Sequence, residues 1–208
     1  MKKFFKAVLL PIALCLPLLG EQCPVREVEV PIPLAADVPF QINSTNAVYA
    51  DVKTVNFTAN VEQAIADAGL NKDNVIEIRI ESVVYTITQN TSASTSLFSG
   101  VLRVGPQSAT NPQTANTLIQ LNNVNLNAVA DQPQSPALNA AGVTFLNTRL
   151  RNAIISRTDS GVFKVFLDGQ VSPAPPPNLA FRLTAQLNLT VVVIEEVELP
   201  GGCSNPLE

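Results

Sequence analysis

The sequence of 208 residues contains no histidine and no tryptophan, and only 5% of its residues are aromatic. Without histidine, the chain cannot assemble the Ser/His/Asp or Cys/His arrangements that activate a nucleophile, nor the usual histidine-containing zinc sites. The fingerprints of phosphate-binding loops, G-x-x-x-x-G-K-[ST] and G-x-G-x-x-G, are also missing from it. Carboxylate chemistry and calcium binding are the site chemistries that this composition leaves open.

Positive charge is also scarce, because the chain has 13 Lys and Arg against 17 Asp and Glu. Lys2, Lys3 and Lys6 lie in the first 20 residues, a segment typical of a removable export signal. Without these three lysines the balance is 10 basic against 17 acidic residues, a net charge of −7. Such a chain has no basic patch for a phosphate backbone and is repelled by an anionic membrane surface, so we expect no nucleic-acid partner.

Long hydrophobic runs are missing except at the N-terminus. Residues 1–20 combine the lysine cluster, an apolar stretch at 7–19, and Gly20, a small residue at which a signal peptidase can cut. This stretch is shorter than the about 20 residues of a membrane span, and Pro11 and Pro17 interrupt it. We therefore predict a signal peptide over 1–20 and a single β-rich domain over 21–208 without a transmembrane segment. The expected location is extracytoplasmic: periplasm, cell surface or secreted.

The chain has only three cysteines, and Cys15 lies within the predicted signal. Cys23 and Cys203 remain, near the two ends of the mature chain. An even pair in an exported protein predicts a disulfide, which stabilises by about 4–5 kcal/mol in the chain-entropy model. Two alternatives stay open. One is a lipid anchor on Cys23, although residues 20–22 fit a lipobox poorly, and the other is a free or intermolecular thiol.

Alternation of apolar and polar residues dominates the rest of the chain, as is typical of half-buried strands. In residues 28–34 the apolar positions share one face, and Pro31 and Pro33 between them remove hydrogen-bond donors from one side. This pattern predicts an edge strand with a blocked edge. Further strands are expected at 38–42 and 48–58. Residues 161–172 and 179–199 are expected to form a closing hairpin, the second strand with an unbroken apolar face from Phe181 to Val193.

Two further runs keep one apolar face only if each contains a β-bulge, because a slip of one residue turns every side chain to the other face. In the first run the apolar set changes phase near Glu81 and Ser82, and in the second between Leu121 and Val124. The expected core residues of the first run are Ile76, Ile78 and Ile80 before the slip and Val83, Tyr85 and Ile87 after it.

Two segments switch to helical spacing. A short helix is predicted from a cap at Asn60, with Gly69 as the residue that follows its end. A long helix is predicted from a cap at Ser135, and Gly142 on its apolar stripe indicates a close approach to a sheet. The fold class is therefore mainly β: an antiparallel β-sandwich or incomplete barrel of about seven to nine strands, with one long and one short helix packed on it.

Few side chains are candidates for chemistry, and each has a simpler interpretation. Glu77, Arg79 and Glu81 alternate on one strand face, which is typical of solvated ion pairs. Residues 71–74 and Asp168-Gly169 resemble oxygen-rich calcium loops but are better interpreted as turns. Two sets remain: the acidic residues Glu27, Glu29, Glu195, Glu196 and Glu198 as a calcium cluster, and the outward amides Gln120, Asn123, Asn125 and Asn127 as a carbohydrate surface or plain solvent-facing row.

The leading functional hypothesis is an exported, non-enzymatic protein with a structural or binding role at the bacterial cell envelope. It requires no cofactor, and its expected partner is an envelope protein, a glycan or a lipid. The first alternative is a carrier of a lipid or other apolar ligand in a cavity between sheet and helix. The second is a glycan-processing enzyme that works through two carboxylates.

Overall fold

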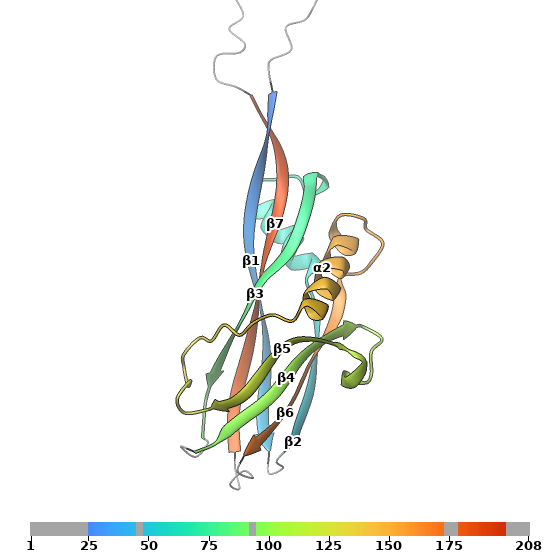
Figure 1. Cartoon of the computed structure of the whole chain (residues 1–208). Coiled ribbons are helices and arrows are strands. Elements are labelled where there is room, and N and C mark those ends of the chain that lie inside the picture. The colour runs from blue at the N-terminus through green and yellow to red at the C-terminus, as the bar shows by residue number, and fades with distance from the viewer. Residues whose placement is uncertain (1–24, 45–47, 92–94, 173–178, 199–208) are drawn as a thin grey trace, which may run out of the picture. The chain divides into compact units, whose positions relative to one another are not determined.

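The computed structural model describes residues 25–44, 48–91, 95–172 and 179–198 (Figure 1). The predicted signal peptide, Cys23 and Cys203 lie outside these residues. The chain divides into a compact unit of residues 28–195 and a small unit formed by 1–27 with 196–208. Of the small unit, the structure describes only the two strand ends, 25–27 and 196–198.

Strands make up 58% of the structure. The two α-helices are α1 (Thr58–Asp67) and α2 (Ala140–Ile154), and two short 3₁₀ turns are η1 (Lys72–Asn74) and η2 (Pro112–Thr114). No helix within the described ranges is long and apolar enough to cross a membrane. The described strands are β1 (Val25–Ser44), β2 (Val48–Asn56), β3 (Val75–Thr88), β4 (Leu97–Pro106), β5 (Asn116–Asn125), β6 (Val162–Ser172) and β7 (Leu179–Glu198).

The strands form two antiparallel sheets, ordered β1-β7-β3 and β2-β6-β4-β5. This confirms the predicted sandwich with two helices; the described strands form no closed barrel. The order is that of a jelly roll, with the segment 126–139 bonded to β3 where an eighth strand would lie. The predicted hairpin of residues 161–172 and 179–199 is wrong, because β6 and β7 lie in different sheets and each pairs with strands from earlier in the chain.

Strand β1 is an edge strand, as its prolines predict. Pro31, Pro33 and Pro39 are all exposed and all at odd positions, so their missing N–H groups fall on the same side of the strand. The Tyr49 hydroxyl donates to the carbonyl oxygen of Gln41 at 3.2 Å, which places the odd-numbered backbone groups on the free side. The two strands expected at 28–34 and 38–42 are one continuous strand.

Strand β3 contains the predicted bulge, because its pairing with β7 shifts between Ile80 and Ser82. Val83, Tyr85 and Ile87 are buried after the shift, as expected. A second shift near Val75 was not predicted and corrects one core assignment. Val75 is buried there, whereas Ile76 is 44% exposed.

Both helices begin at residues other than the predicted caps. The Asn56 side chain accepts from the Thr58 N–H at 3.1 Å, so α1 begins before Asn60, and Gly69 follows its end with φ +71° as predicted. Helix α2 begins after Asn139, whose side chain accepts from the Ala141 N–H at 3.0 Å. The predicted cap Ser135 is wrong because the chain there is still extended beside β3.

Helix α2 packs directly on strand β5 through Gly142. A Cβ atom at Gly142 would lie 2.4 Å from the carbonyl oxygen of Thr117 and 2.7 Å from the Cα of Leu118. Leu146 and Leu150 continue this buried stripe, each 1% exposed. The predicted close approach of helix and sheet is therefore confirmed.

Two aromatic pairs fill the interior. The rings of Phe98 on β4 and Phe181 on β7 meet edge to face, with centroids 5.4 Å apart, so they join the two sheets. Phe57, just before α1, stacks on Phe163 of β6 at the same centroid separation. All four side chains are at most 1% exposed, so with the equally buried Phe40 they are among the largest apolar groups removed from water on folding.

Replacement of Gly142 by Ala tests the contact between helix and sheet. Alanine is favoured over glycine inside a helix by about 1 kcal/mol, so a loosely packed helix would gain stability. We expect instead a loss of about 1–3 kcal/mol in the free energy of unfolding, measured by urea titration, because the neighbouring atoms are backbone and cannot yield. The exposed neighbour provides the control: Ala141→Gly should cost only about 1 kcal/mol. If Gly142→Ala has a higher free energy of unfolding than wild type, α2 does not contact β5 as closely as the structure shows.

Candidate functional site

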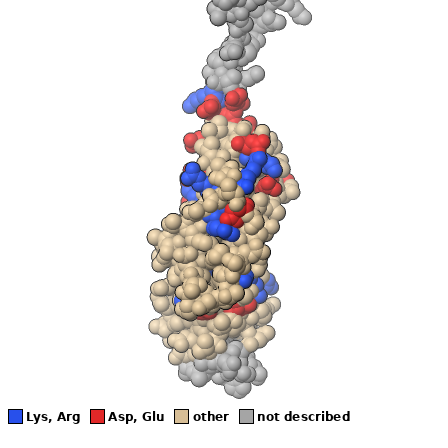
Figure 2. Space-filling model, turned by 90° about the vertical axis from the view of Figure 1, so that its right-hand side faces the viewer, with Lys and Arg blue, Asp and Glu red and all other residues tan. Residues whose placement is uncertain are grey.

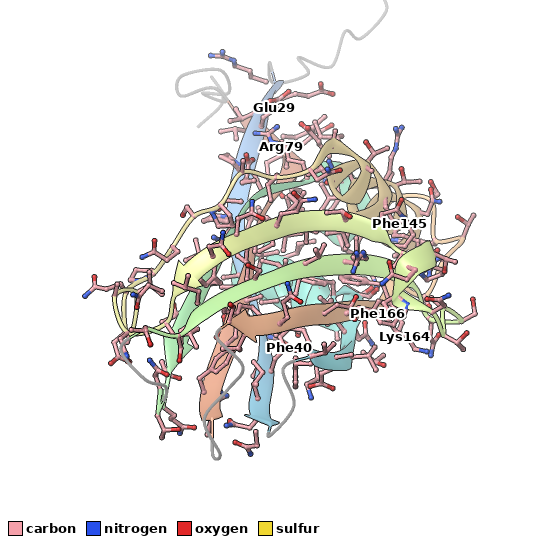
Figure 3. The ribbon with its side chains drawn as sticks, turned by 60° about the horizontal axis from the view of Figure 1, so that its bottom comes forward. Glu29, Phe40, Arg79, Phe145, Lys164 and Phe166 are labelled. Carbon is pink, nitrogen blue, oxygen red and sulfur yellow. The ribbon has the colours of Figure 1, made fainter. Side chains whose placement is uncertain are left out.

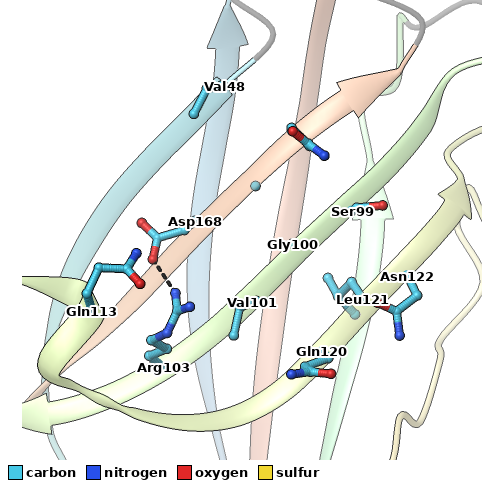
Figure 4. Close-up of a pocket in the computed structure, with 12 residues that line it drawn as sticks. Val48, Ser99, Gly100, Val101, Arg103, Gln113, Gln120, Leu121, Asn122 and Asp168 are labelled. Carbon is cyan, nitrogen blue, oxygen red and sulfur yellow. Dashed lines mark hydrogen bonds and ion pairs between the residues drawn. The ribbon is translucent and has the colours of Figure 1, made fainter.

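A polar groove lies on the outer face of the four-stranded sheet, the face turned away from the other sheet (Figure 4). Its volume is about 400 Å³, within the range of small-molecule sites. Strands β4, β5 and β6 supply most of the lining, and Val48 of β2 and Gln113 of η2 complete it. Its uncharged polar side chains are Ser99, Gln113, Gln120, Asn122 and Gln170.

The backbone beneath the groove is shaped by two glycines that face each other across strands, Gly100 on β4 and Gly169 on β6. A Cβ at Gly169 would lie 2.4 Å from the ring of Phe98, and one at Gly100 would lie 2.8 Å from the same ring. The ring therefore lies flat across both strands on the core side. Paired glycines allow a sheet to bend, and Figure 3 shows β4 and β5 curving across the molecule.

A bulge in β5 forms one wall of the groove, where the pairing of β4 with β5 shifts between Phe98 and Gly100. Asn123 adopts φ +48° there, a left-handed conformation that asparagine tolerates better than most residues. Ser99 holds it in two ways: its hydroxyl accepts from the Asn123 N–H at 2.9 Å and donates to the Asn123 side-chain oxygen at 3.0 Å. The predicted slip between Leu121 and Val124 is confirmed.

The turn that contains η2 covers one end of the outer face. The Asn111 side chain accepts from the Gln113 N–H at 2.8 Å, and the Lys164 ammonium donates to the carbonyl oxygen of Ala109 at 2.7 Å. Phe166 points outward from β6 beside Lys164 (Figure 3), yet it is only 4% exposed. The turn therefore closes one end of the groove, where Gln113 of η2 is part of the lining.

The charged residues of the groove neutralise each other. The Arg103 guanidinium of β4 donates to a carboxylate oxygen of Asp168 on β6 at 2.5 Å (Figure 4). Both side chains are mostly shielded from water, with exposures of 16% and 22%. Sequence reasoning missed this pair because it assigned Asp168-Gly169 to a turn. That assignment is wrong, since both residues lie inside β6.

Of the four amides predicted to form an outward row, only Gln120 lines the groove. Asn123 is used by the bulge, and the Asn125 side chain accepts from the N–H groups of Asn127 and Ala128 after the strand. Asn122, the preceding residue in the bulge, lines the groove where the sequence pattern predicted Asn123. The slip itself was predicted, but not that the Asn123 side chain bonds Ser99 within the bulge.

Two of the remaining predicted sites, the charged residues of β3 and the turn at 71–74, behave as their simpler interpretations suggest. Arg79 bonds Glu77 at 3.0 Å and Glu81 at 2.6 Å on the exposed face of β3. The hydrogen bond from Arg79, aided by one from Thr190, holds the pKa of Glu81 below its ordinary value. Residues 71–74 form a turn capped by the Asn71 side chain. Within the described ranges, no three His, Cys, Asp or Glu side chains come together to hold a metal ion.

A second polar cluster lies on the inward face of strand β2. Asp51 accepts from Lys53 at 2.9 Å and from the N–H of Val52 at 2.7 Å. Burial alone raises the pKa of Asp51, but the hydrogen bonds from Lys53 and from the N–H of Val52 hold it below its ordinary value. Burial, followed by the charge of Asp51, raises the pKa of the Tyr49 phenol strongly. The cluster therefore places two charged side chains on the inward face of β2, which is an edge strand of its sheet. Neither Asp51 nor Lys53 lines the groove.

No protein-family model and no curated protein sequence matches the chain. Among solved structures, Desmodium yellow mottle tymovirus is 16% identical with a TM-score of 0.35, covering 97% of this chain and 95% of that one. The acidic stable capsid structure of Helicobacter pylori bacteriophage KHP30 is 15% identical with a TM-score of 0.38, covering 84% and 100%. Turnip yellow mosaic virus is 15% identical with a TM-score of 0.31, covering 98% and 95%. These scores are too low to support an argument about function.

Replacement of Gly169 by Ala tests the packing beneath the groove. The added methyl group meets the Phe98 ring, so we expect a loss of about 1–3 kcal/mol in the free energy of unfolding. In a Phe98→Leu background the obstacle is smaller, and the same Gly169→Ala change should cost measurably less. Urea titration of the four proteins measures this coupling. An equal cost in both backgrounds shows that the ring is not what the glycine accommodates.

The Asp51 cluster predicts a specific pH dependence. Because the folded-state pKa of Asp51 is lowered, its contribution to stability is present above the pKa of the unfolded chain and lost as the pH falls through the folded value. Wild type should therefore exceed Asp51→Asn by up to about 1 kcal/mol at neutral pH, and the difference should begin to shrink at about pH 4 and vanish only below the lowered pKa of folded Asp51. Urea titrations across this range measure it. A Lys53→Met background should reduce the difference, whereas parallel curves at all pH values refute the interaction.

Proposed function

We propose that this chain is an exported, non-enzymatic protein that acts by binding at the bacterial cell envelope, with the groove on β4, β5 and β6 as its binding surface. One observation carries the proposal: the groove is polar and preformed, and its charged groups, Arg103 and Asp168, bond each other at 2.5 Å. A rigid sheet face binds without the entropic cost of ordering a loop.

The same ion pair favours binding over catalysis. Asp168 is the one carboxylate in the described lining, and a carboxylate held by a guanidinium is a poor proton shuttle. A glycan-processing enzyme of the two-carboxylate type needs a partner for it across the groove. Within the described lining Asp168 has no second carboxylate to act with, so the carboxylate mechanism gains no support.

Export is supported by the N-terminal residues alone: Lys2, Lys3 and Lys6, the apolar stretch at 7–19, and Gly20. The disulfide between Cys23 and Cys203 stays a prediction that fits this location. On the face in Figure 2, acidic and basic side chains lie intermixed, and the lower part of the view carries few of either. Such a surface suits a neutral partner better than nucleic acid.

The carrier alternative needs a cavity for an apolar ligand, and it was expected between a sheet and a helix. An open, mostly apolar pocket of about 610 Å³ does lie there, lined by Asn116 of β5 and by Ala140 and Phe145 of α2. The space between the two sheets is filled. Phe98 and Phe181 meet there with ring centroids 5.4 Å apart, and both are fully buried. The groove itself lies on the outside of the sandwich, and seven of its twelve lining residues carry polar side chains. The filled space between the sheets and the polar side chains of the groove favour a surface-binding role, whereas the open pocket beside α2 is the feature that supports the carrier alternative.

Fractionation of bacteria that produce the full chain tests the proposal. We expect a mature chain that begins at Glu21, lacks the mass of two hydrogens relative to its reduced form, and sediments in part with the envelope. Gln120→Arg, which places a long charged side chain on the groove wall, should shift the protein into the soluble extracytoplasmic fraction. Quantitative blotting and intact mass spectrometry provide the readouts.

The matched control is Gln41→Arg, the same change at an exposed position on β1 in the other sheet. It should distribute like wild type. Cytoplasmic protein with an unprocessed N-terminus overturns export, and equal envelope retention of all three chains overturns the groove as the binding surface. Circular dichroism of each variant confirms that the distribution does not reflect unfolding.

A further inference from the structure

Four amide side chains in the groove are not engaged by the protein. Gln113, Gln120, Asn122 and Gln170 are all exposed, and within the described residues none of their side chains forms a hydrogen bond. Elsewhere many asparagine side chains hold backbone groups: Asn56, Asn71, Asn111, Asn139 and Asn147 each accept from an N–H group. The groove therefore gathers amides that have no structural task.

Each free amide can both donate and accept hydrogen bonds, and so can a hydroxyl group. A ligand rich in hydroxyls matches all four side chains whichever way their amides rotate. A ligand with only acceptors, such as a phosphate, can use the NH₂ donors of the amides but not their carbonyl oxygens, and it binds better to positively charged side chains. The one cation of the described lining, Arg103, is already bonded to Asp168, which removes that preference.

Apolar surface lies between the amides. Val48 is 69% exposed and Val101 is partly exposed, whereas Leu121, which also lines the groove, is buried in the core at 3%. A sugar ring presents C–H groups on its faces and hydroxyls at its edge, so it matches both kinds of lining at once. A peptide fits less well, because the backbone groups of β4 are already paired with β5 and β6 and offer no strand edge.

We infer that the groove on β4, β5 and β6 binds a neutral carbohydrate, with Gln113, Gln120, Asn122 and Gln170 bonding its hydroxyls and Val101 contacting its ring. This inference rests on the proposed function and names the ligand class. The bulge held by Ser99 and the glycine pair packed on Phe98 keep the wall and the floor in place. Binding then costs mainly the ordering of the exposed amides.

The test is a titration of the full chain with neutral hexasaccharides made of glucose in β-1,4 and α-1,4 linkage, xylose, mannose and N-acetylglucosamine, followed by NMR. The side-chain NH₂ signals of the four amides report on the groove directly. We expect saturable shifts of these signals with at least one hexasaccharide. Polygalacturonate hexamer, which is acidic, should bind at least ten-fold more weakly than the best neutral sugar.

Alanine variants identify the groups responsible. Gln120→Ala and Asn122→Ala should each weaken binding about three- to ten-fold, the loss typical of one hydrogen bond. Gln63→Ala is the control, because Gln63 is an exposed amide on α1 that bonds Asp67 instead. It should bind like wild type. Both groove positions are exposed, so the variants should unfold at the wild-type urea concentration.

Three outcomes overturn the inference: no neutral hexasaccharide shifts the amide signals, both groove variants bind like wild type, or only the acidic hexamer binds. If envelope retention still depends on Gln120 in the fractionation experiment, the failure concerns the ligand class alone. If retention is also independent of Gln120, the proposed function fails with it.

Discussion

The sandwich depends on one aromatic ring. Phe98 lies across Gly100 and Gly169 on the inner side of the four-stranded sheet and meets Phe181 of the other sheet edge to face. Any side chain at either glycine would occupy the volume of this ring. The glycine pair thus lets a large apolar group join the sheets at their centre, and on the opposite side the same bent backbone forms the floor of the groove. The core packing and the proposed binding surface therefore share the same stretch of backbone.

The edges of both sheets are protected in four different ways within the described residues. Prolines remove donors from β1, and the segment 126–139 bonds the edge of β3. The N–H of Asn139 bonds the carbonyl oxygen of Leu118 on β5. Strand β2 carries inward charges, Asp51 and Lys53, which an added strand would have to bury. With its edges protected, the molecule offers a partner the face of a sheet rather than an edge.

Sequence reasoning succeeded where the signal is local. The prolines of β1, the slips in β3 and β5, and the glycine of α2 each appear in a short stretch and were interpreted correctly. It failed where a distant segment decides the outcome. Strand β4 was not recognised, and Asp168-Gly169 was assigned to a turn although Gly169 faces Gly100 inside the sheet. The helix start at Asn139 was missed because residues 126–139 first pair with β3.

The sequence by itself determined which side chains share a face, because alternation along a strand requires no knowledge of the neighbouring strand. It also determined that β1 is an edge strand and where β3 and β5 change phase. Only the tertiary structure decided which strands lie side by side. Arg103 and Asp168 are 65 positions apart, and only the pairing of β4 with β6 brings their charges together. The groove depends on such long-range pairings, so no local pattern could have predicted it.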